Sequence, residues 1–106
     1  MLQKKEFLLN NNIVSYLVRP DSEGFYTIIY IHGFPFHKEM WSGQLLALTA
    51  GFTGIAYDVR GFGSSTTDHY FFSIDLFARD LIELIKQLNL KNVILCGLSM
   101  GGYIAL

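Results

Sequence analysis

The sequence predicts a single α/β domain in which a β-hairpin is followed by parallel strands joined by crossover helices. Two observations support this fold class. Candidate strands and candidate helices alternate after residue 25, which is the order of elements in a parallel α/β sheet. The three candidate strands at 25–31, 53–58 and 92–96 are mostly apolar and show no polar alternation, as expected for strands covered on both faces. Connections between such strands are almost always right-handed.

The first elements of the chain predict an antiparallel hairpin. The runs 4–9 and 12–18 are predicted as two short strands, and Asn10-Asn11-Asn12 between them has the composition of a tight turn. A polar segment with proline and glycine at 19–24 then predicts a loop. The aromatic and β-branched run 25–31 follows this loop, so the first parallel strand begins there.

Two helices separate the parallel strands. The first is predicted at 40–49, where apolar residues recur at roughly helical spacing. The second is predicted at 74–88, because its apolar residues repeat with the helical period and charged residues occupy the other positions. Ser73 stands where an N-cap residue belongs. After the strand at 92–96, a third helix is expected to begin at Ser99.

Composition excludes several classes of protein. The 106 residues suffice for one domain with a modest core, and 51% hydrophobic against 16% charged residues excludes intrinsic disorder. A formal net charge of −1 indicates no affinity for nucleic acid or for an anionic membrane surface. Cys96 is the single cysteine, which excludes an internal disulfide and favours a cytoplasmic location. No spacing of histidine, cysteine and carboxylate residues indicates a metal, and none indicates a cofactor.

The segment Gly97-Leu98-Ser99-Met100-Gly101 has the G-x-S-x-G pattern of a nucleophile at a sharp turn between a strand and a helix. A serine hydroxyl can attack a substrate only if it stands clear of the sheet, and the two glycines allow the close backbone approach that such a turn needs. The N-terminus of the following helix would favour a developing oxyanion. The alternative is an ordinary glycine-rich turn in which Ser99 only caps the helix.

A second motif, His32-Gly33-Phe34-Pro35-Phe36, directly follows the first parallel strand. Loops at the carboxyl ends of parallel strands are where such sheets bind ligands. Gly33 lets the chain turn back and Pro35 stiffens it, so that the backbone N–H of Phe34 could serve as an oxyanion donor. For His32, hydrogen bonds to neighbouring backbone are the favoured interpretation, because nothing in the sequence places its ring beside the nucleophile.

The third motif, 58–65, follows the second parallel strand and contains Asp58, Arg60, Gly61 and Gly63. Two closely spaced glycines also occur in phosphate-binding loops, but no helix is predicted to begin here and the third spaced glycine is absent. We therefore expect a structural turn in which Asp58 and Arg60 tie neighbouring loops together.

The order and spacing of these three motifs resemble the α/β-hydrolase family, and most closely its esterase, enol-lactonase and perhydrolase-like branch. The resemblance implies that Ser99 is the nucleophile and that the backbone N–H groups of Phe34 and Met100 form the oxyanion hole. It also implies that the chain contains the N-terminal part of an α/β-hydrolase fold. A serine at the elbow, where an aspartate would otherwise stand, argues against the related haloalkane dehalogenases and epoxide hydrolases.

The family places the acid and the histidine of its triad after the nucleophile. The sequence ends at Leu106, and its histidines, including His37 and His69, precede Ser99. Residues 1–106 are therefore expected to be an incomplete domain that is inactive alone and that self-associates or pairs with a missing C-terminal part. The predicted function of the intact protein is a serine hydrolase for a small ester, lactone or related acyl substrate. The alternative is a non-catalytic α/β fragment that acts as an interaction or folding module.

Overall fold

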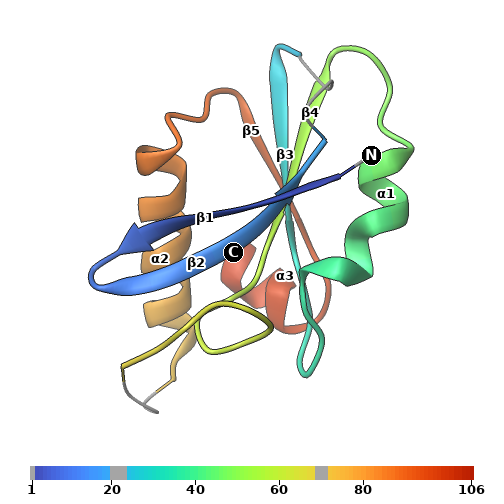
Figure 1. Ribbon diagram of the computed structural model, residues 1–106. Coiled ribbons are helices and arrows are strands. Elements are labelled where there is room, and N and C mark those ends of the chain that lie inside the picture. Colours follow the sequence, from blue (N-terminus) through green and yellow to red (C-terminus); the bar gives the residue numbers. More distant parts are fainter. Residues whose placement is uncertain (1, 20–23, 69–71) are drawn as a thin grey trace.

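Figure 1 shows the computed structural model of the chain, which describes residues 2–19, 24–68 and 72–106. Most of the predicted loop at 19–24, and His69, lie outside the described residues. Five strands form one sheet in the order β1-β2-β4-β3-β5. The strands are β1 (Gln3–Leu9), β2 (Asn12–Val18), β3 (Tyr26–Ile31), β4 (Phe52–Tyr57) and β5 (Val93–Gly97).

The sheet is mixed, as the sequence predicts. β3 runs parallel to both β4 and β5, whereas β2 is antiparallel to β1 and to β4. Asn10 and Asn11 form the hairpin turn with φ values of 48° and 69°. Two consecutive positive φ angles are the requirement of a type I′ turn, and asparagine tolerates this conformation. The prediction of an α/β fold with an N-terminal hairpin is confirmed.

The first helical segment differs from its prediction at 40–49. A 3₁₀ turn, η1, spans Lys38–Trp41, and the α-helix α1 spans only Ser42–Leu46. The turn begins earlier because the carboxylate of Asp58 accepts a hydrogen bond from the backbone N–H of Lys38 at 2.7 Å. The α-helix ends before Leu48, whose side chain packs over Gly54 of β4 in space that a Cβ atom at Gly54 would fill.

The longest helix, α2, spans Ile74–Gln87 and matches the predicted element closely. The hydroxyl of Ser73 accepts a hydrogen bond from the N–H of Leu76 at 3.0 Å, which is the expected N-cap. The buried face of α2 contributes Phe77, Leu81 and Leu84 to the core. A short third helix, α3, follows β5 and spans Met100–Ala105.

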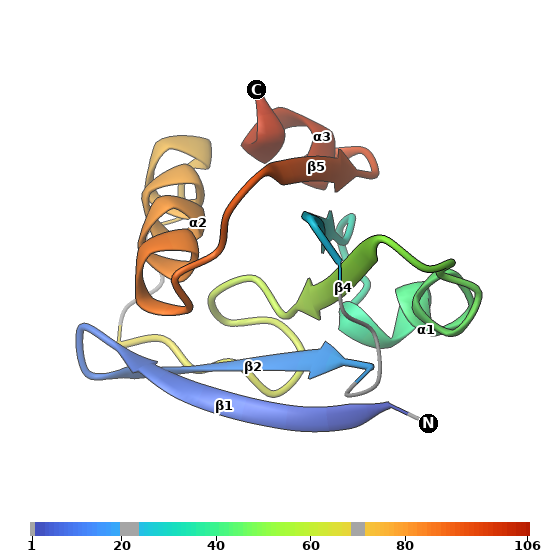
Figure 2. The ribbon, with the colours of Figure 1, turned by 90° about the horizontal axis from the view of Figure 1, so that it is seen from above.

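The helices cover both faces of the sheet. Figure 2 shows α2 and α3 on one side of the central strands and α1 on the other. Each side has its own apolar cluster: the larger contains Ile29 and Leu81, and the smaller contains Trp41 and Leu45. None of the helices in the described part of the chain is long and apolar enough to cross a membrane.

The two outer strands of the sheet differ in character. The outer strand β1 begins with Gln3-Lys4-Lys5-Glu6, four exposed polar residues, and charges of this kind discourage pairing with other chains. At the opposite edge, β5 carries no charge and leaves Ile94 and Leu95 exposed by 42% and 36%. The edge strand β5 therefore lacks the charges that protect β1 against pairing with another strand.

Candidate active site

Ser99 occupies the junction between β5 and α3 in a conformation that non-glycine residues rarely adopt. Its φ and ψ are 55° and −111°, its side chain makes no capping hydrogen bond, and the residue is exposed. Ser99 thus occupies the N-cap position of α3, but its hydroxyl does not cap the helix. Strained backbone of this kind costs about 1–3 kcal/mol and occurs preferentially at functional sites. The turn presents the hydroxyl outside the sheet, as nucleophilic attack requires.

Two glycines make this turn possible. A Cβ atom at Gly97 would collide with the backbone of Gly101, and one at Gly101 would collide with the carbonyl of Ile31 at the end of β3. Helix α3 therefore lies directly against the ends of β5 and β3. At Gly102, by contrast, the nearest atom to an added Cβ would be 3.7 Å away. The G-x-S-x-G pattern thus reflects close packing at its two glycines, and Gly102 has no such constraint.

The loop after β3 passes alongside Ser99. A Cβ atom at Gly33 would lie 3.6 Å from the Cβ atom of Ser99 and 3.1 Å from the carbonyl oxygen of Leu98. The N–H of Leu98 in turn donates to the carbonyl of Ile31 at 3.1 Å. Strand β3, its following loop and the serine turn therefore form one compact unit at the carboxyl end of the sheet.

Two backbone donors beside Ser99 are available for a ligand. Among the hydrogen bonds of residues 2–19, 24–68 and 72–106, none uses the N–H of Phe34 or that of Met100. Phe34 follows Gly33, and Met100 is the first residue of α3, whose N–H has no acceptor within the helix. Unpaired N–H groups at a helix start favour negative charge.

His32 is fully buried, and both of its ring nitrogens are engaged. The N–H of Val59 donates to Nε2 at 3.0 Å, and Nδ1 lies 2.9 Å from the carbonyl oxygen of Gly33. Because the first partner is only a donor and the second only an acceptor, the ring is neutral and carries its proton on Nδ1. Burial lowers the pKa of His32 and so favours this neutral form. Its nitrogens hold the loop to the segment after β4 and are not available as a base for Ser99.

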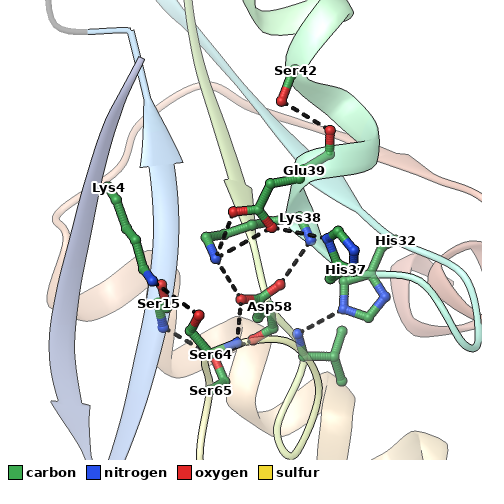
Figure 3. A network of polar contacts seen from close by, with 11 residues as sticks. Lys4, Ser15, His32, His37, Lys38, Glu39, Ser42, Asp58, Ser64 and Ser65 are labelled. Carbon is green, nitrogen blue, oxygen red and sulfur yellow. Dashed lines mark hydrogen bonds and ion pairs between the residues drawn. The ribbon is translucent and has the colours of Figure 1, made fainter.

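Asp58 is the centre of a buried polar network that Figure 3 shows. Its carboxylate accepts from the backbone N–H of Lys38 at 2.7 Å, from the Lys38 ammonium at 2.6 Å and from the N–H of Ser64 at 2.8 Å. Neither Lys38 nor Asp58 is accessible to solvent. A buried ion pair is retained only where such additional hydrogen bonds satisfy its partners. The ion pair of Lys38 could not be predicted from the sequence, because no local pattern connects this lysine to a carboxylate twenty positions away.

Arg60 connects the same turn to helix α2. Its guanidinium donates two hydrogen bonds to the carboxylate of Asp80, at 2.9 Å and 2.8 Å. These bonds to Asp80 raise the pKa of Arg60. Gly61 and Gly63 have φ values of 81° and 53°, as the tight turn requires. Arg60 also pairs with the carboxylate of Asp68 in the following loop at 3.7 Å, so it connects the turn both to a helix and to a neighbouring loop.

The surroundings of Ser99 are apolar and open. A hollow on the exposed side of α3 is lined by Ser99, Gly102, Tyr103 and Leu106. In the described part of the chain, no histidine or carboxylate is hydrogen-bonded to Ser99. His37 bonds instead to the carboxylate of Glu39 at 2.9 Å. Within the same residues, no group of three histidine, cysteine or carboxylate side chains could hold a metal ion.

Comparisons with known proteins agree on one family. A model described as the alpha/beta hydrolase family matches residues 28–106. A non-heme chloroperoxidase of Kitasatospora aureofaciens is 43% identical over 71% of this chain and 28% of its own length. The 3-oxoadipate enol-lactonase 2 of Acinetobacter baylyi is 32% identical over 71% of this chain and 28% of its own length. The chain thus spans little more than a quarter of these relatives.

A solved structure gives the same result in three dimensions. A crystal structure of bromoperoxidase from Bacillus anthracis superimposes with a TM-score of 0.82 and 35% sequence identity. The match covers 97% of this chain and 37% of that chain. The fold of this chain is therefore that of one part of a larger solved structure.

Proposed function

Because this chain belongs to the alpha/beta hydrolase family, we propose that it supplies the nucleophile and the oxyanion hole of a serine hydrolase. The substrate class is a small ester, lactone or related acyl compound. The observation that carries the proposal is the strained, exposed Ser99 with two unpaired backbone N–H groups, of Phe34 and Met100, in the adjoining segments. The name of the enol-lactonase relative supports an acyl substrate.

In the proposed reaction, the hydroxyl of Ser99 attacks the carbonyl carbon of the substrate and loses its proton to a base. The oxygen of the tetrahedral intermediate accepts hydrogen bonds from the N–H groups of Phe34 and Met100. Collapse of the intermediate breaks the bond to the alkoxide oxygen, which takes the proton from the base and becomes the alcohol. The acyl-serine that remains is hydrolysed by water to the carboxylic acid and free Ser99. Each donor is a backbone group, so the side chains of these two residues are free to shape the acyl site.

A base and its orienting acid are required in addition, because a serine hydroxyl alone is a weak nucleophile at neutral pH. We propose that both come from polypeptide beyond these residues, in the family order of serine, acid and histidine. This segment would pair with the open edge of β5. We call the longer protein that includes these partners the complete hydrolase. We also propose a cytoplasmic location, since Cys96 is free, as is usual for cysteines in a reducing compartment.

A perhydrolase reaction is a second candidate, favoured by the chloroperoxidase and bromoperoxidase names of similar proteins. In that reaction, hydrogen peroxide takes the place of water in attacking the acyl-serine, and a peracid leaves. The nucleophile and oxyanion donors are the same, so the two reactions differ only in the second step. Comparing peracid with carboxylic acid as products from one ester, with peroxide present, distinguishes them.

Labelling with a fluorophosphonate probe tests the proposed nucleophile. We expect the complete hydrolase to be labelled at Ser99, as peptide mapping would show, and Ser99→Ala to abolish labelling. Ser42→Ala is the control, since the Ser42 hydroxyl bonds to the carbonyl of Glu39 in the helical segment after the loop. Labelling that persists in the Ser99→Ala protein would contradict the assignment. An unlabelled but folded wild-type protein would favour the alternative of a non-catalytic module.

A further inference from the structure

We propose that Lys38 and Asp58 are positioning residues that hold the Phe34 N–H in place, an inference that rests on the proposed function. The loop that carries this N–H runs from residue 32 to residue 37. Its middle contains one turn hydrogen bond, from the N–H of Phe36 to the carbonyl of Gly33 at 2.8 Å, and an edge contact between Phe34 and Phe62, while Phe34 and Phe36 remain exposed by 69% and 51%. An oxyanion donor must nevertheless be fixed before the charge develops. Because the turn bond is internal to the loop, the buried contacts at the two ends of the loop contribute most to fixing it relative to the sheet.

Both ends of the loop are buried and attached to the same two consecutive residues. At the first end, Nε2 of His32 accepts from the N–H of Val59 at 3.0 Å. At the second end, Lys38 binds the carboxylate of Asp58 through its backbone N–H and its ammonium group, at 2.7 Å and 2.6 Å. Figure 3 shows these contacts around the loop. One dipeptide, Asp58-Val59, thus sets the distance between the two ends.

This dipeptide is itself immobilised. The N–H of Asp58 donates to the carbonyl of Ser15 at 2.9 Å, and the Asp58 carbonyl accepts from the hydroxyl of Ser65 at 2.7 Å. The N–H of Ser64 donates to the Asp58 carboxylate at 2.8 Å. At Gly63, an added Cβ atom would collide with that carboxylate, so the turn is closed tightly around it. Movement of Asp58 would break hydrogen bonds to β2 and to the turn at 58–65. The loop at 32–37 is bound to Asp58-Val59, so its ends are held in place as well.

The ammonium group of Lys38 compensates the buried negative charge of the Asp58 carboxylate. A backbone N–H at position 38 could bind the carboxylate whatever the side chain. The carboxylate, however, has no solvent contact, and a buried charge is retained only when it is paired. Lys38 neutralises it from within the same loop end, and Glu39 lies 3.2 Å from the ammonium on the exposed side. Because Lys38 compensates its charge, the Asp58 carboxylate can remain buried and accept the hydrogen bond from the backbone N–H at the end of the loop.

A matched pair of variants separates positioning from general stability. Asp58→Asn and Asp80→Asn each replace a carboxylate by an amide within a buried ion pair, but only Asp58 touches the loop. In the complete hydrolase, we expect Asp58→Asn to lower the acylation rate constant, measured as a pre-steady-state burst with a p-nitrophenyl ester, by about 10- to 100-fold. The dissociation constant of the ester, taken from the concentration dependence of the burst rate, should change little. We expect Asp80→Asn to leave the acylation rate constant unchanged at temperatures at which both proteins are folded.

A second measurement does not depend on activity. Hydrogen exchange followed by mass spectrometry should show faster exchange in peptides covering 33–37 for Asp58→Asn, and not for Asp80→Asn. If Asp58→Asn does not fold, Lys38→Met is used in the same two assays with the same expectations. The proposal would be overturned if Asp58→Asn and Asp80→Asn lowered the acylation rate constant equally. It would also be overturned if Asp58→Asn changed neither the acylation rate constant nor the hydrogen exchange of 33–37. If the wild-type protein is not labelled at Ser99, the proposed function fails, and the exchange result still decides whether the loop is anchored by this pair.

Discussion

Helix α3 carries two adjacent glycines in different surroundings, and replacing each by alanine tests how tightly the serine turn packs on the sheet. A Cβ atom at Gly101 would lie 2.1 Å from the carbonyl oxygen of Ile31, whereas real Cβ atoms stay beyond 3.0 Å. The helix would have to move by about 1 Å, and the obstructing atoms are backbone atoms that cannot rotate away. At Gly102, the nearest atom would be 3.7 Å away.

The expected magnitude follows from two opposing effects. Replacing glycine by alanine inside a helix stabilises the protein by about 1 kcal/mol, and this gain is common to both variants. Overpacking costs about 1–3 kcal/mol, and we expect the upper end because the clash at Gly101 is with backbone. Gly101→Ala should therefore have a free energy of unfolding about 3 kcal/mol below that of Gly102→Ala. Since the helix-propensity effect cancels in the comparison, the difference reports the clash alone.

Urea unfolding of the two complete hydrolase variants, followed by circular dichroism, measures this difference. Fluorophosphonate labelling of the same samples provides a second readout, because a shift of α3 would also move Ser99. We expect slower labelling for Gly101→Ala and no change for Gly102→Ala. Equal stability of the two variants would refute the reasoning, since it would mean that α3 does not lie against the end of β3 as described.

Three further predictions address the loop, the ring of His32 and the open edge of the sheet. Phe34→Pro removes a backbone donor and should lower kcat by about 10²–10³, whereas Phe34→Leu keeps the N–H and should retain most activity; equal kcat values would argue against the donor. Burial lowers the pKa of His32 below the ordinary 6.5. The unfolded chain therefore binds the proton more readily, so the stability due to His32 is complete above about pH 6.5 and declines as the pH falls through the lowered value. Urea unfolding at about pH 7.5 and pH 5.5 should show a steeper acid loss than in His32→Asn, and parallel losses would contradict this. The isolated chain of 106 residues should not hydrolyse p-nitrophenyl esters and should elute from a sizing column as an oligomer, because β5 is an open apolar edge. A monomer whose hydrolysis depends on Ser99 would show that the missing base is not needed.

Much of the fold could be predicted because its signals are local. The hairpin turn needs two residues that accept positive φ, and Asn10 and Asn11 provide them. Helix α2 follows from its own periodicity and from Ser73, whose hydroxyl reaches an N–H only three positions away. The serine turn depends on glycines at fixed spacing. Each of these features is decided by residues within a few positions of one another, so the sequence alone suffices.

Only the tertiary structure decides which distant segments become neighbours. The position of β4 between β2 and β3 brings Asp58, at the end of β4, beside Lys38, and this contact starts the 3₁₀ turn before the predicted helix. The same arrangement pairs Arg60 with Asp80 and assigns the proton of His32 to Nδ1. Buried charges and ring tautomers depend on partners that are remote in the chain, because a polar group is stable in the interior only when a specific neighbour satisfies it. The serine turn can thus be recognised from consecutive residues, Gly97 to Gly101. The anchoring of the loop at 32–37 beside it depends on the packing of the sheet.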